Sequence, residues 1–182
     1  MALSHFFNLG SFTLFLSLFL TLSSTYIKST PLVSEICAQT QNPSQCNLVL
    51  GPAPGASTAD LKGLGYISIN IALTNAKQTL SYIESLVKQA IDKMLRNRYQ
   101  TCVENYASTI DSLEQSKTFL NNGDIPSLRT FASAAFDGPE TCNDSFEGPP
   151  AAPSKLNDDN RKLEGLVDIL LTIGERLDEK NK

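Results

Sequence analysis

The sequence predicts an all-α protein: a four-helix bundle of up-down-up-down topology, preceded by a small helical hairpin. Two observations carry this prediction. Apolar residues recur three and four positions apart over most of the chain, which is the spacing of a helix with one buried face. No run of alternating apolar and polar residues rich in Val, Ile and Thr is long enough to build a sheet. Four long stretches of helical spacing, joined mostly by short connections, favour a bundle.

The first segment, residues 1–29, has the features of a signal peptide. Phe6–Leu22 is an almost uninterrupted run of apolar and small residues, and a polar chain follows it. The residues before Phe6 include no Lys or Arg, so a membrane anchor is the alternative. The run is at the lower limit of length for spanning a bilayer, and no basic cluster flanks it. We therefore expect secretion, with cleavage within about residues 23–30.

Removal of this segment would leave one ordinary domain at residues 30–182. We assign residues 30–56 to the hairpin and a linker, and residues 57–178 to the bundle. The full chain has 15 basic and 19 acidic residues, a formal net charge of −4, which becomes −5 on loss of Lys28. A mildly acidic protein is not expected to bind nucleic acid, because phosphates need a basic surface. No membrane contact is expected once the leader is gone.

The hairpin is predicted from two cysteines and a turn. Cys37 and Cys46 flank Asn42-Pro43, a turn signal that can fold two short helical turns back on each other. Four cysteines in an exported chain indicate paired thiols, and they allow three connectivities. The short spacing favours Cys37 with Cys46, which leaves Cys102 with Cys142. Reduced, buried thiols are the alternative.

The first bundle helix follows the Gly- and Pro-rich linker at residues 51–55. Ser57 with Asp60 resembles a capping box, so we expect the helix to begin there or just after Gly65. Its apolar stripe steps by three and four residues, as in a core-facing helix. The predicted stripe is Ile69, Leu73, Ala76, Leu80, Ile83, Val87 and Ala90.

The second helix is separated from the first by a turn that the sequence marks weakly. There is no Gly or Pro from Tyr66 to Asn122, and a single helix of that length would span about 85 Å, too long for this domain. The apolar pattern fails at Asn97 and Arg98, so we predict the turn within residues 92–98. The second helix ends at Gly123. Its predicted buried residues are Tyr99, Cys102, Val103, Tyr106, Ile110, Leu113 and Leu120.

The third and fourth helices are predicted from proline positions and apolar stripes. Pro126 lies near the first position of the third helix, and Gly138-Pro139 is expected to interrupt that helix before Cys142. A proline-rich linker at residues 147–153 follows, and Ser154 is expected to cap the fourth helix. The third helix is expected to bury Leu128, Phe131, Ala132, Ala135 and Phe136. The fourth is expected to bury Leu156, Leu163, Leu166, Val167, Leu170, Ile173 and Leu177, before a charged tail at 178–182 that should fray.

The sequence after residue 29 contains no histidine, because the only one in the chain is His5. Ser-His-Asp and Cys-His arrangements, most zinc sites and di-iron bundles therefore lack an essential member. Carboxylate-only catalysis and magnesium or calcium binding are not excluded in this way. We expect a binding protein with no catalytic residue, no metal and no cofactor. An extracellular carrier of a small ligand, with a hollow apolar core, is an alternative of another class.

Three stretches carry a family likeness: SEICAQTQNPSQC at 34–46, TCVENYASTIDSL at 101–113 and FASAAFDGPETCNDSFEGPP at 131–150. Together they resemble the plant invertase and pectin methylesterase inhibitor family. The likeness covers essentially the whole chain after the leader. Two further segments are more similar to pectin methylesterase inhibitors than to invertase inhibitors: DLKGLG at 60–65 and DSFEGPP at 144–150.

The resemblance implies a secreted protein of the apoplast and cell wall, with two disulfides paired first to second and third to fourth. It implies a reversible one-to-one complex with pectin methylesterase that covers the pectin-binding cleft of that enzyme. The inhibitor itself would catalyse nothing, and we expect the free protein to be a monomer. An inhibitor of cell-wall or vacuolar invertase on the same scaffold is the nearest alternative.

In such a complex the surface of the second and third helices is implied to face the enzyme. Glu104, Ser108 and Asp111 are spaced by four and three, so they share one polar helix face. The alternative is that these are ordinary solvated positions, and that Asn105 or Tyr106 is a buried polar group tied to the backbone. The candidate partner-binding residues are Glu104, Asn105, Ser108, Asp111, Thr141 and Asp144.

One usable glycosylation sequon is present, at Asn143-Asp144-Ser145. Asn42-Pro43-Ser44 is disqualified by its proline. A glycan on Asn143 would lie beside Thr141 and would obstruct the expected contact surface.

Overall fold

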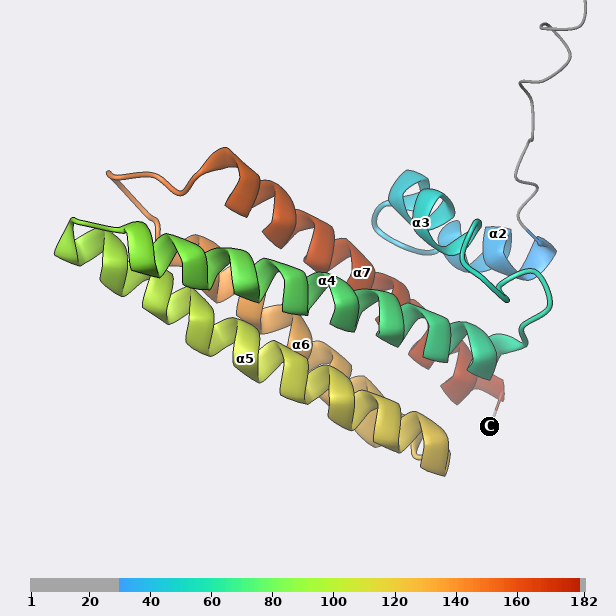
Figure 1. Ribbon diagram of the computed structural model, residues 1–182. Coiled ribbons are helices and arrows are strands. Elements are labelled where there is room, and N and C mark those ends of the chain that lie inside the picture. The colour runs from blue at the N-terminus through green and yellow to red at the C-terminus, as the bar shows by residue number, and fades with distance from the viewer. Residues whose placement is uncertain (1–29, 181–182) are drawn as a thin grey trace, which may run out of the picture.

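The computed structural model describes residues 30–180, and the regular structure in this range is entirely helical. Two short helices, α2 (Pro31–Cys37) and α3 (Pro43–Leu50), form a hairpin. Four long helices follow: α4 (Leu61–Gln89), α5 (Lys93–Asn122), α6 (Ile125–Asp144) and α7 (Ser154–Lys180). Figure 1 shows the long helices side by side, with the hairpin against the bundle on the side of α4 and α7. The predicted fold class is confirmed, while the predicted leader and the last two residues of the tail lie outside the described residues.

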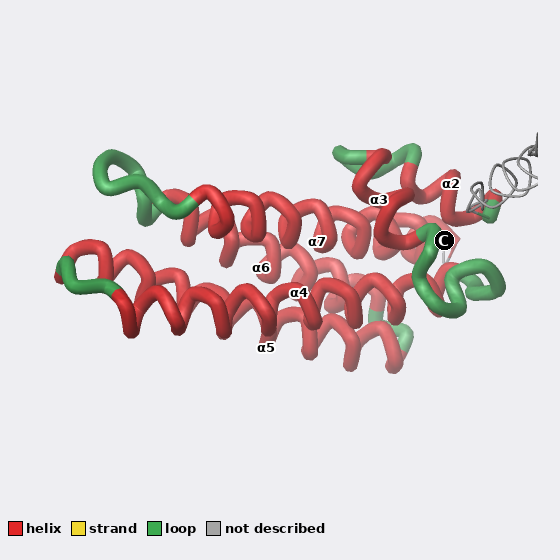
Figure 2. Tube along the Cα trace, turned by 45° about the horizontal axis from the view of Figure 1, so that its top comes forward, coloured by secondary structure: helices red, strands yellow, loops and turns green. Residues whose placement is uncertain are grey.

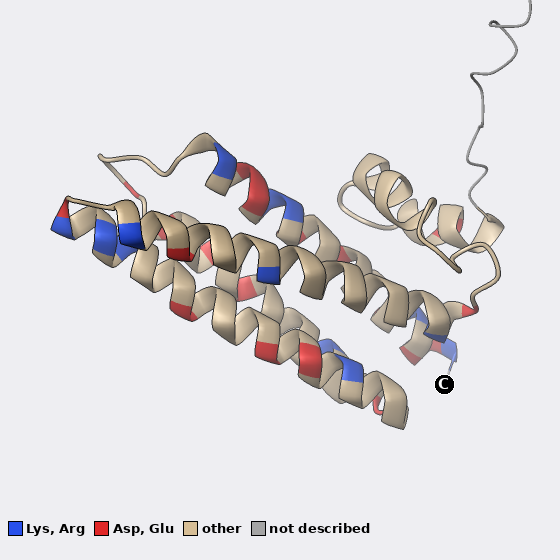
Figure 3. Cartoon of the chain, in the orientation of Figure 1, with Lys and Arg blue, Asp and Glu red and all other residues tan. Residues whose placement is uncertain are grey.

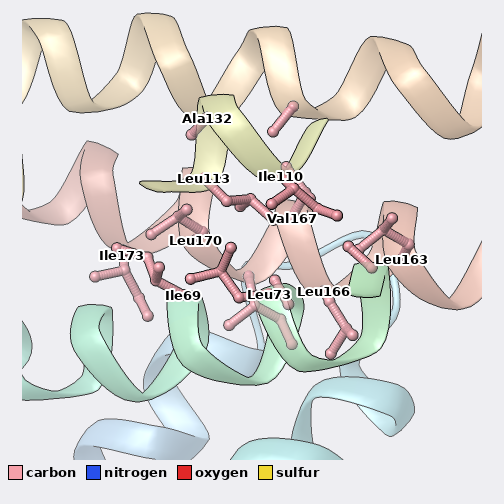
Figure 4. Close-up of a cluster of buried hydrophobic side chains, with 14 of the residues drawn as sticks. Ile69, Leu73, Ile110, Leu113, Ala132, Leu163, Leu166, Val167, Leu170 and Ile173 are labelled. Carbon is pink, nitrogen blue, oxygen red and sulfur yellow. The ribbon is translucent and has the colours of Figure 1, made fainter. Parts of the chain in front are cut away.

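The four long helices form a closed ring. Each packs against the next along the chain, and α7 returns to pack against α4. Figure 2 shows the connections at the two ends of the bundle, as an up-down-up-down topology requires. Figure 4 shows side chains from all four helices pointing into one shared core. Those labelled there are all buried: Ile69, Leu73, Ile110, Leu113, Ala132, Leu163, Leu166, Val167, Leu170 and Ile173.

The apolar stripes predicted for the four helices face this core. Most of their members are buried. Phe131 stacks on Phe119 with ring centroids 5.1 Å apart, at the margin of the core. The predicted core residues that are only half-buried are Leu80, Val87, Val103, Phe131, Phe136 and Leu177.

The start of α4 differs from the prediction. The helix begins at Leu61, and Asp60 is its N-cap, with a side-chain oxygen that accepts a hydrogen bond from the Gly63 N–H at 2.7 Å. The predicted start at Ser57, and the alternative start after Gly65, are both wrong. An Asp oxygen fills the same capping role as a Ser hydroxyl, so the helix begins one turn beyond Ser57.

The turn between α4 and α5 comes earlier than predicted. It occupies residues 90–92, where Ala90 adopts extended backbone and Asp92 caps α5 through the Leu95 N–H at 2.7 Å. Asn97 and Arg98 are helical, so most of the predicted range is wrong. The apolar pattern fails at Asn97 and Arg98 because the end of α4 and the start of α5 extend past the core. The 96 % exposure of Ile91 in the connection between them indicates this.

The third long helix also departs from the prediction, because α6 runs through Gly138-Pro139 as far as Asp144. Pro139 has no N–H to offer the carbonyl oxygen of Ala135, four residues earlier. The Thr109 hydroxyl of α5 donates a hydrogen bond to that oxygen at 3.3 Å instead. The helix therefore continues because a neighbouring helix satisfies the group that proline leaves unpaired.

The ends of α5 and α7 complete the comparison. Gly123 ends α5 as predicted, with a left-handed φ of 75° and a hydrogen bond from its N–H to Leu120. Ser154 is the first residue of α7 and not its cap, since the Pro153 carbonyl already accepts the Asn157 N–H at 3.2 Å. None of the helices between residues 30 and 180 has a stretch apolar and long enough to cross a membrane.

Both predicted disulfides are confirmed. Cys37 and Cys46 join α2 to α3 with a Cα–Cα distance of 5.3 Å, and Cys102 and Cys142 join α5 to α6 at 4.6 Å. All four cysteines are 0 % exposed.

Candidate partner-binding surface

The predicted polar face of α5 is exposed to solvent. Glu104, Ser108 and Asp111 all lie on the outside of the bundle, and the Ser108 hydroxyl donates to the Glu104 backbone carbonyl at 3.2 Å. Within residues 30–180, neither the Glu104 nor the Asp111 carboxylate has an ion pair or a hydrogen bond to its side-chain oxygens. Glu114, on the same helix, is already paired with Lys77 at 2.9 Å. The two unpaired carboxylates are therefore available to a partner.

The second part of the surface is the last turn of α6. Thr141 and Asp144 are exposed, while Cys142 between them is buried in its disulfide to Cys102. Asn143 is turned toward α7. Thr141 is two residues from Asn143, about 200° around the helix, so it points away from α7. The disulfide holds this turn beside the half of α5 that carries Glu104.

A glycine keeps α5 and α6 in close approach behind this surface. A Cβ at Gly138 would lie 1.9 Å from the Thr109 hydroxyl oxygen and 2.8 Å from the Asn105 carbonyl oxygen. Asn105 itself is half-buried, and its side-chain N–H donates to the Thr101 carbonyl at 2.8 Å. Of the two predictions for Asn105, its contacts favour the polar group tied to the backbone.

Four polar side chains form a chain of hydrogen bonds through this end of the bundle. The Tyr106 hydroxyl donates to the Asn160 side-chain oxygen at 2.6 Å, and the Asn160 amide donates to the Asn143 side-chain oxygen at 2.6 Å. The Asn143 amide then donates to the Glu164 carboxylate at 3.2 Å. Tyr106 and Asn160 are both 0 % exposed. This chain links α5, α7 and α6, and its buried donors and acceptors are all satisfied, as buried polar groups need to be.

Burial changes the titration of the groups at the two ends of this chain. It raises the pKa of Tyr106 far above its usual range, so the phenol keeps its proton and acts as a donor. Burial also raises the pKa of Glu164; the nearby Glu140 adds to the shift and Arg161 opposes it. The predicted burial of Tyr106 is confirmed, but its hydroxyl is tied to the Asn160 side chain and not to the backbone. Local spacing did not predict this partner, because it lies on another helix.

The Asn143 sequon is part of this chain. A glycan would be attached at the side-chain nitrogen, which here donates to Glu164. Substituting that nitrogen removes a proton from it and places a bulky group where α6 meets α7. Glycosylation of Asn143 stays a prediction. A glycan there would require the contact between Asn143 and Glu164 to rearrange.

An arginine that the sequence did not single out orders the loop after α6. The Arg98 guanidinium donates to the carbonyl oxygens of Gly148 at 3.1 Å and Pro150 at 2.7 Å. It also lies over the Phe146 ring, 5.7 Å from the centroid, and Phe146 packs on Tyr99 with centroids 5.4 Å apart. These contacts hold the loop next to Asp144. No local pattern predicts that Arg98 binds this loop, because its acceptors lie about 50 residues away in sequence.

The described part of the chain offers no group of three or more His, Cys, Asp and Glu that could hold a metal ion. The surface consists of exposed carboxylates and hydroxyls on two cross-linked helices. Such an arrangement is suited to contacts with another macromolecule.

Comparison with known proteins agrees with this architecture. A family model described as plant invertase/pectin methylesterase inhibitor matches residues 31–173. A pectinesterase inhibitor of Actinidia deliciosa is 55% identical over 146 residues, which cover 80% of this chain and 79% of that protein. A putative invertase inhibitor of Platanus acerifolia is 31% identical over 128 residues, which cover 70% of this chain and 72% of that protein. A crystal structure of a mutant form of a pectin methylesterase inhibitor from Arabidopsis has a TM-score of 0.72 at 28% identity, covering 80% of this chain and 97% of that one.

Proposed function

The chain belongs to the plant invertase/pectin methylesterase inhibitor family, and from this premise we propose that it is an inhibitor of pectin methylesterase. The observation that carries the proposal is the 55% identity to a pectinesterase inhibitor over 80% of the chain. The putative invertase inhibitor named above is 31% identical over a shorter range. Inhibition of invertase is therefore the less supported alternative.

The protein acts as a binder and not as an enzyme. The two curated relatives described above are named as inhibitors, and the sequence after residue 29 has no histidine. In the proposed mechanism one inhibitor binds one esterase molecule and covers the cleft that takes the polysaccharide. Preorganisation supports this mode of action, because two disulfides and a filled core leave little conformational freedom to lose on binding.

The α5–α6 surface is the part proposed to face the enzyme. Glu104 and Asp111 bring two unpaired carboxylates to it, which suits a polar or basic group on the esterase. Rim charges of this kind accelerate association more than they deepen affinity. Each exposed pair contributes about 0.2–1 kcal/mol.

The proposed site of action is the cell wall. An exported protein is consistent with the two disulfides, which persist in oxidising compartments. N-terminal sequencing of the protein recovered from a plant secretion assay would give the cleavage site, expected within about residues 23–30. Retention of the intact leader on a membrane would contradict this part of the proposal.

The function is tested by adding the oxidised protein, residues 30–182, to a purified plant pectin methylesterase. We expect release of methanol from pectin to fall to near zero at one equivalent of inhibitor, and invertase activity to be unaffected. Light scattering of the mixture should give the mass of one copy of each protein. Full esterase activity beside excess inhibitor would refute the proposal, and selective inhibition of invertase would replace it with the alternative.

The contact surface is tested with Glu104→Ala and Asp111→Ala. Each should weaken inhibition by up to about fivefold, the equivalent of about 1 kcal/mol, with most of the change in the association rate at low salt. Glu114→Ala is the matched control, since it removes a carboxylate of the same helix that is already paired with Lys77. Unchanged inhibition by both variants would remove Glu104 and Asp111 from the interface.

A further inference from the structure

The connection between α4 and α5 is the most exposed apolar point among the described residues. Ile91 is 96 % exposed and Met94 is 50 % exposed, three positions apart at the end of the bundle. Neither the proposed inhibitory surface nor the core uses these side chains. Large apolar side chains exposed together in this way mark a contact site more often than a single exposed one does.

The same connection is basic, although the protein is acidic. Residues 88–96 carry three basic side chains and one acidic one, a formal net charge of +2 in a chain of −4. Figure 3 shows the blue segments gathered at the α4–α5 turn. The single acid, Asp92, uses a carboxylate oxygen to cap α5. We call residues 88–96 the basic tip.

Three cations of the basic tip are available to a ligand. Within the part of the chain that the structure describes, neither Lys88 nor Lys93 has an ion pair or a hydrogen bond from its ammonium group, and Glu84, one turn before Lys88, does not pair with it. Arg96 is fixed in place, because its guanidinium donates twice to the Ala90 carbonyl, at 3.1 and 2.5 Å. A guanidinium has five N–H donors, so three remain.

We propose that the basic tip binds a carboxylated polysaccharide, a polyuronate such as pectin from which the methyl esters have been removed. Such a polymer presents carboxylates in a row, which suits several cations on one turn. The choice of this polymer rests on the proposed function. The apolar Ile91 and Met94 side chains provide contact area for the C–H faces of the sugar rings, between the cations that hold the carboxylates.

The positive charge of the basic tip and the small apolar area it exposes favour a polyanion over a membrane as its ligand. Two exposed apolar side chains bury too little area to hold a protein on a bilayer, where stable binding needs an amphipathic helix or two anchoring signals. A polymer offers many equivalent sites, so individually weak contacts add through high local concentration. Its binding is driven by release of counterions and is therefore sensitive to salt.

The basic tip is separate from Glu104 and Asp111, the two unpaired carboxylates of the proposed inhibitory surface. Lys93 precedes Glu104 by 11 residues on α5, about 16 Å at the standard helical rise. One molecule is thus able to hold the demethylated product of the esterase near the tip while the α5–α6 surface contacts the enzyme. The tip would keep the inhibitor on regions of wall where the esterase has acted.

The proposal is tested without the esterase, by measuring binding of the oxidised protein to polygalacturonate at several salt concentrations. We expect binding at low ionic strength that weakens steeply as salt is raised, and no binding to highly methyl-esterified pectin. In Lys88→Gln/Lys93→Gln the slope of log affinity against log salt should fall to about a third, because the slope scales with the number of cations neutralised. Lys162→Gln/Lys180→Gln is the matched control, with the same loss of charge away from the tip.

Other outcomes would overturn the proposal. They are no binding to polygalacturonate at low salt, equal loss in the control and the tip variant, or binding to vesicles of anionic lipid without binding to the polymer. Ile91→Ser separates the apolar contribution and should weaken binding by less than the double lysine variant. Esterase inhibition on a short soluble substrate is measured in parallel and should be unchanged in the tip variants, so failure of this proposal is distinguishable from failure of the proposed function.

Discussion

The hairpin and the α5–α6 interface are each held by one disulfide, but the surroundings of the two bonds differ. Cys37 and Cys46 are nine residues apart and close a local loop. The hairpin then meets the bundle on α7 and, through α3, on α4; among its contacts is the Gln41 N–H on the Asp168 carboxylate at 2.8 Å. Cys102 and Cys142 are 40 residues apart and join two long helices of the bundle. One bond fixes an appendage, and the other fixes the core of the candidate surface.

The difference shows which contacts belong to which cooperative unit. The hairpin adds Val33, Ile36 and Leu50 to the core, so it is not free of the bundle. Its polar attachments to α7 are the Gln41 N–H on the buried Asp168 carboxylate, the Gln45 amide on the Lys162 carbonyl and the partly exposed Glu35–Arg176 ion pair. The α5–α6 interface contains the Gly138 approach and the Thr109 hydrogen bond, neither of which can be lost without opening the bundle. We expect the hairpin to open locally and the α5–α6 interface to open only with global unfolding.

Removal of the two disulfides gives the largest expected effects. Cys102→Ala/Cys142→Ala should lower the free energy of unfolding by about 4 kcal/mol and Cys37→Ala/Cys46→Ala by about 3 kcal/mol, from loop length alone. The measurement is urea unfolding together with amide hydrogen exchange. The Cys37→Ala/Cys46→Ala variant should lose protection from hydrogen exchange in the hairpin and keep it in α5 and α6. Equal loss of protection throughout the chain in both variants would remove the distinction between the two regions.

The hydroxyl that replaces the missing proline donor is the next test. Thr109→Val has a similar shape but leaves the buried Ala135 carbonyl unpaired, so we expect a loss of about 1–3 kcal/mol in urea unfolding. Thr74→Val is the control, since its hydroxyl donates to the Asn70 carbonyl of its own exposed turn, and it should change stability by less than about 0.5 kcal/mol. If the two variants were equally stable, the explanation for the continuous α6 would be wrong.

The ion pair between Glu35 of α2 and Arg176 of α7 should contribute less. Both groups are partly exposed, at 51% and 23%, and Glu35→Gln should therefore cost no more than about 1 kcal/mol. We expect faster hydrogen exchange in α2 and α3 and an unchanged urea midpoint for the bundle. A shift of that midpoint as large as the one for Thr109→Val would show that the hairpin and the bundle unfold together.

The pH dependence of stability gives the smallest expected effect and separates two carboxylates of α7. Burial raises the pKa of Asp168, with the Gln41 N–H opposing the shift and Glu175 adding to it, and burial also raises the pKa of Glu164. The folded state therefore binds protons more tightly than the unfolded state. The stabilisation from each group is present below its unfolded pKa and is lost as pH rises through its folded pKa.

We accordingly expect Glu164→Gln to gain stability relative to the unsubstituted protein as pH is raised from about 4 to about 7, since Gln has no proton to lose. Urea unfolding at each pH measures this difference. Asp168→Asn should likewise gain stability relative to the unsubstituted protein as pH is raised. The gain should appear in the hairpin, as increased protection from hydrogen exchange. A difference that stays constant over the pH range would mean that the carboxylates titrate alike in both states.

Much of the fold followed from local pattern. Gly123, Pro126 and the cysteine spacing marked helix ends and disulfides correctly, because backbone conformation and loop length are properties of nearby residues. The α4 start was wrong because Asp60 and Ser57 are equally good caps, and only the packing of Leu61 and Leu64 decides between them. For the candidate site, the sequence predicted only that Glu104, Ser108 and Asp111 share one polar face of a helix. Its neighbours Arg98, Asn160 and Glu164 were not predicted, since each acts on a group far away in sequence.

The sequence by itself determined that this protein is a cross-linked helical bundle with no histidine after residue 29, because apolar period, cysteine spacing and residue inventory require no knowledge of long-range contacts. Only the tertiary structure decided that α6 passes through Pro139, that Asn143 faces α7, and that Lys88 and Lys93 of the basic tip have no ion-pair or hydrogen-bond partner within residues 30–180. Each of these depends on which groups meet across helices. A hydrogen bond or a close approach between two helices is fixed by their packing, which local spacing constrains only in part.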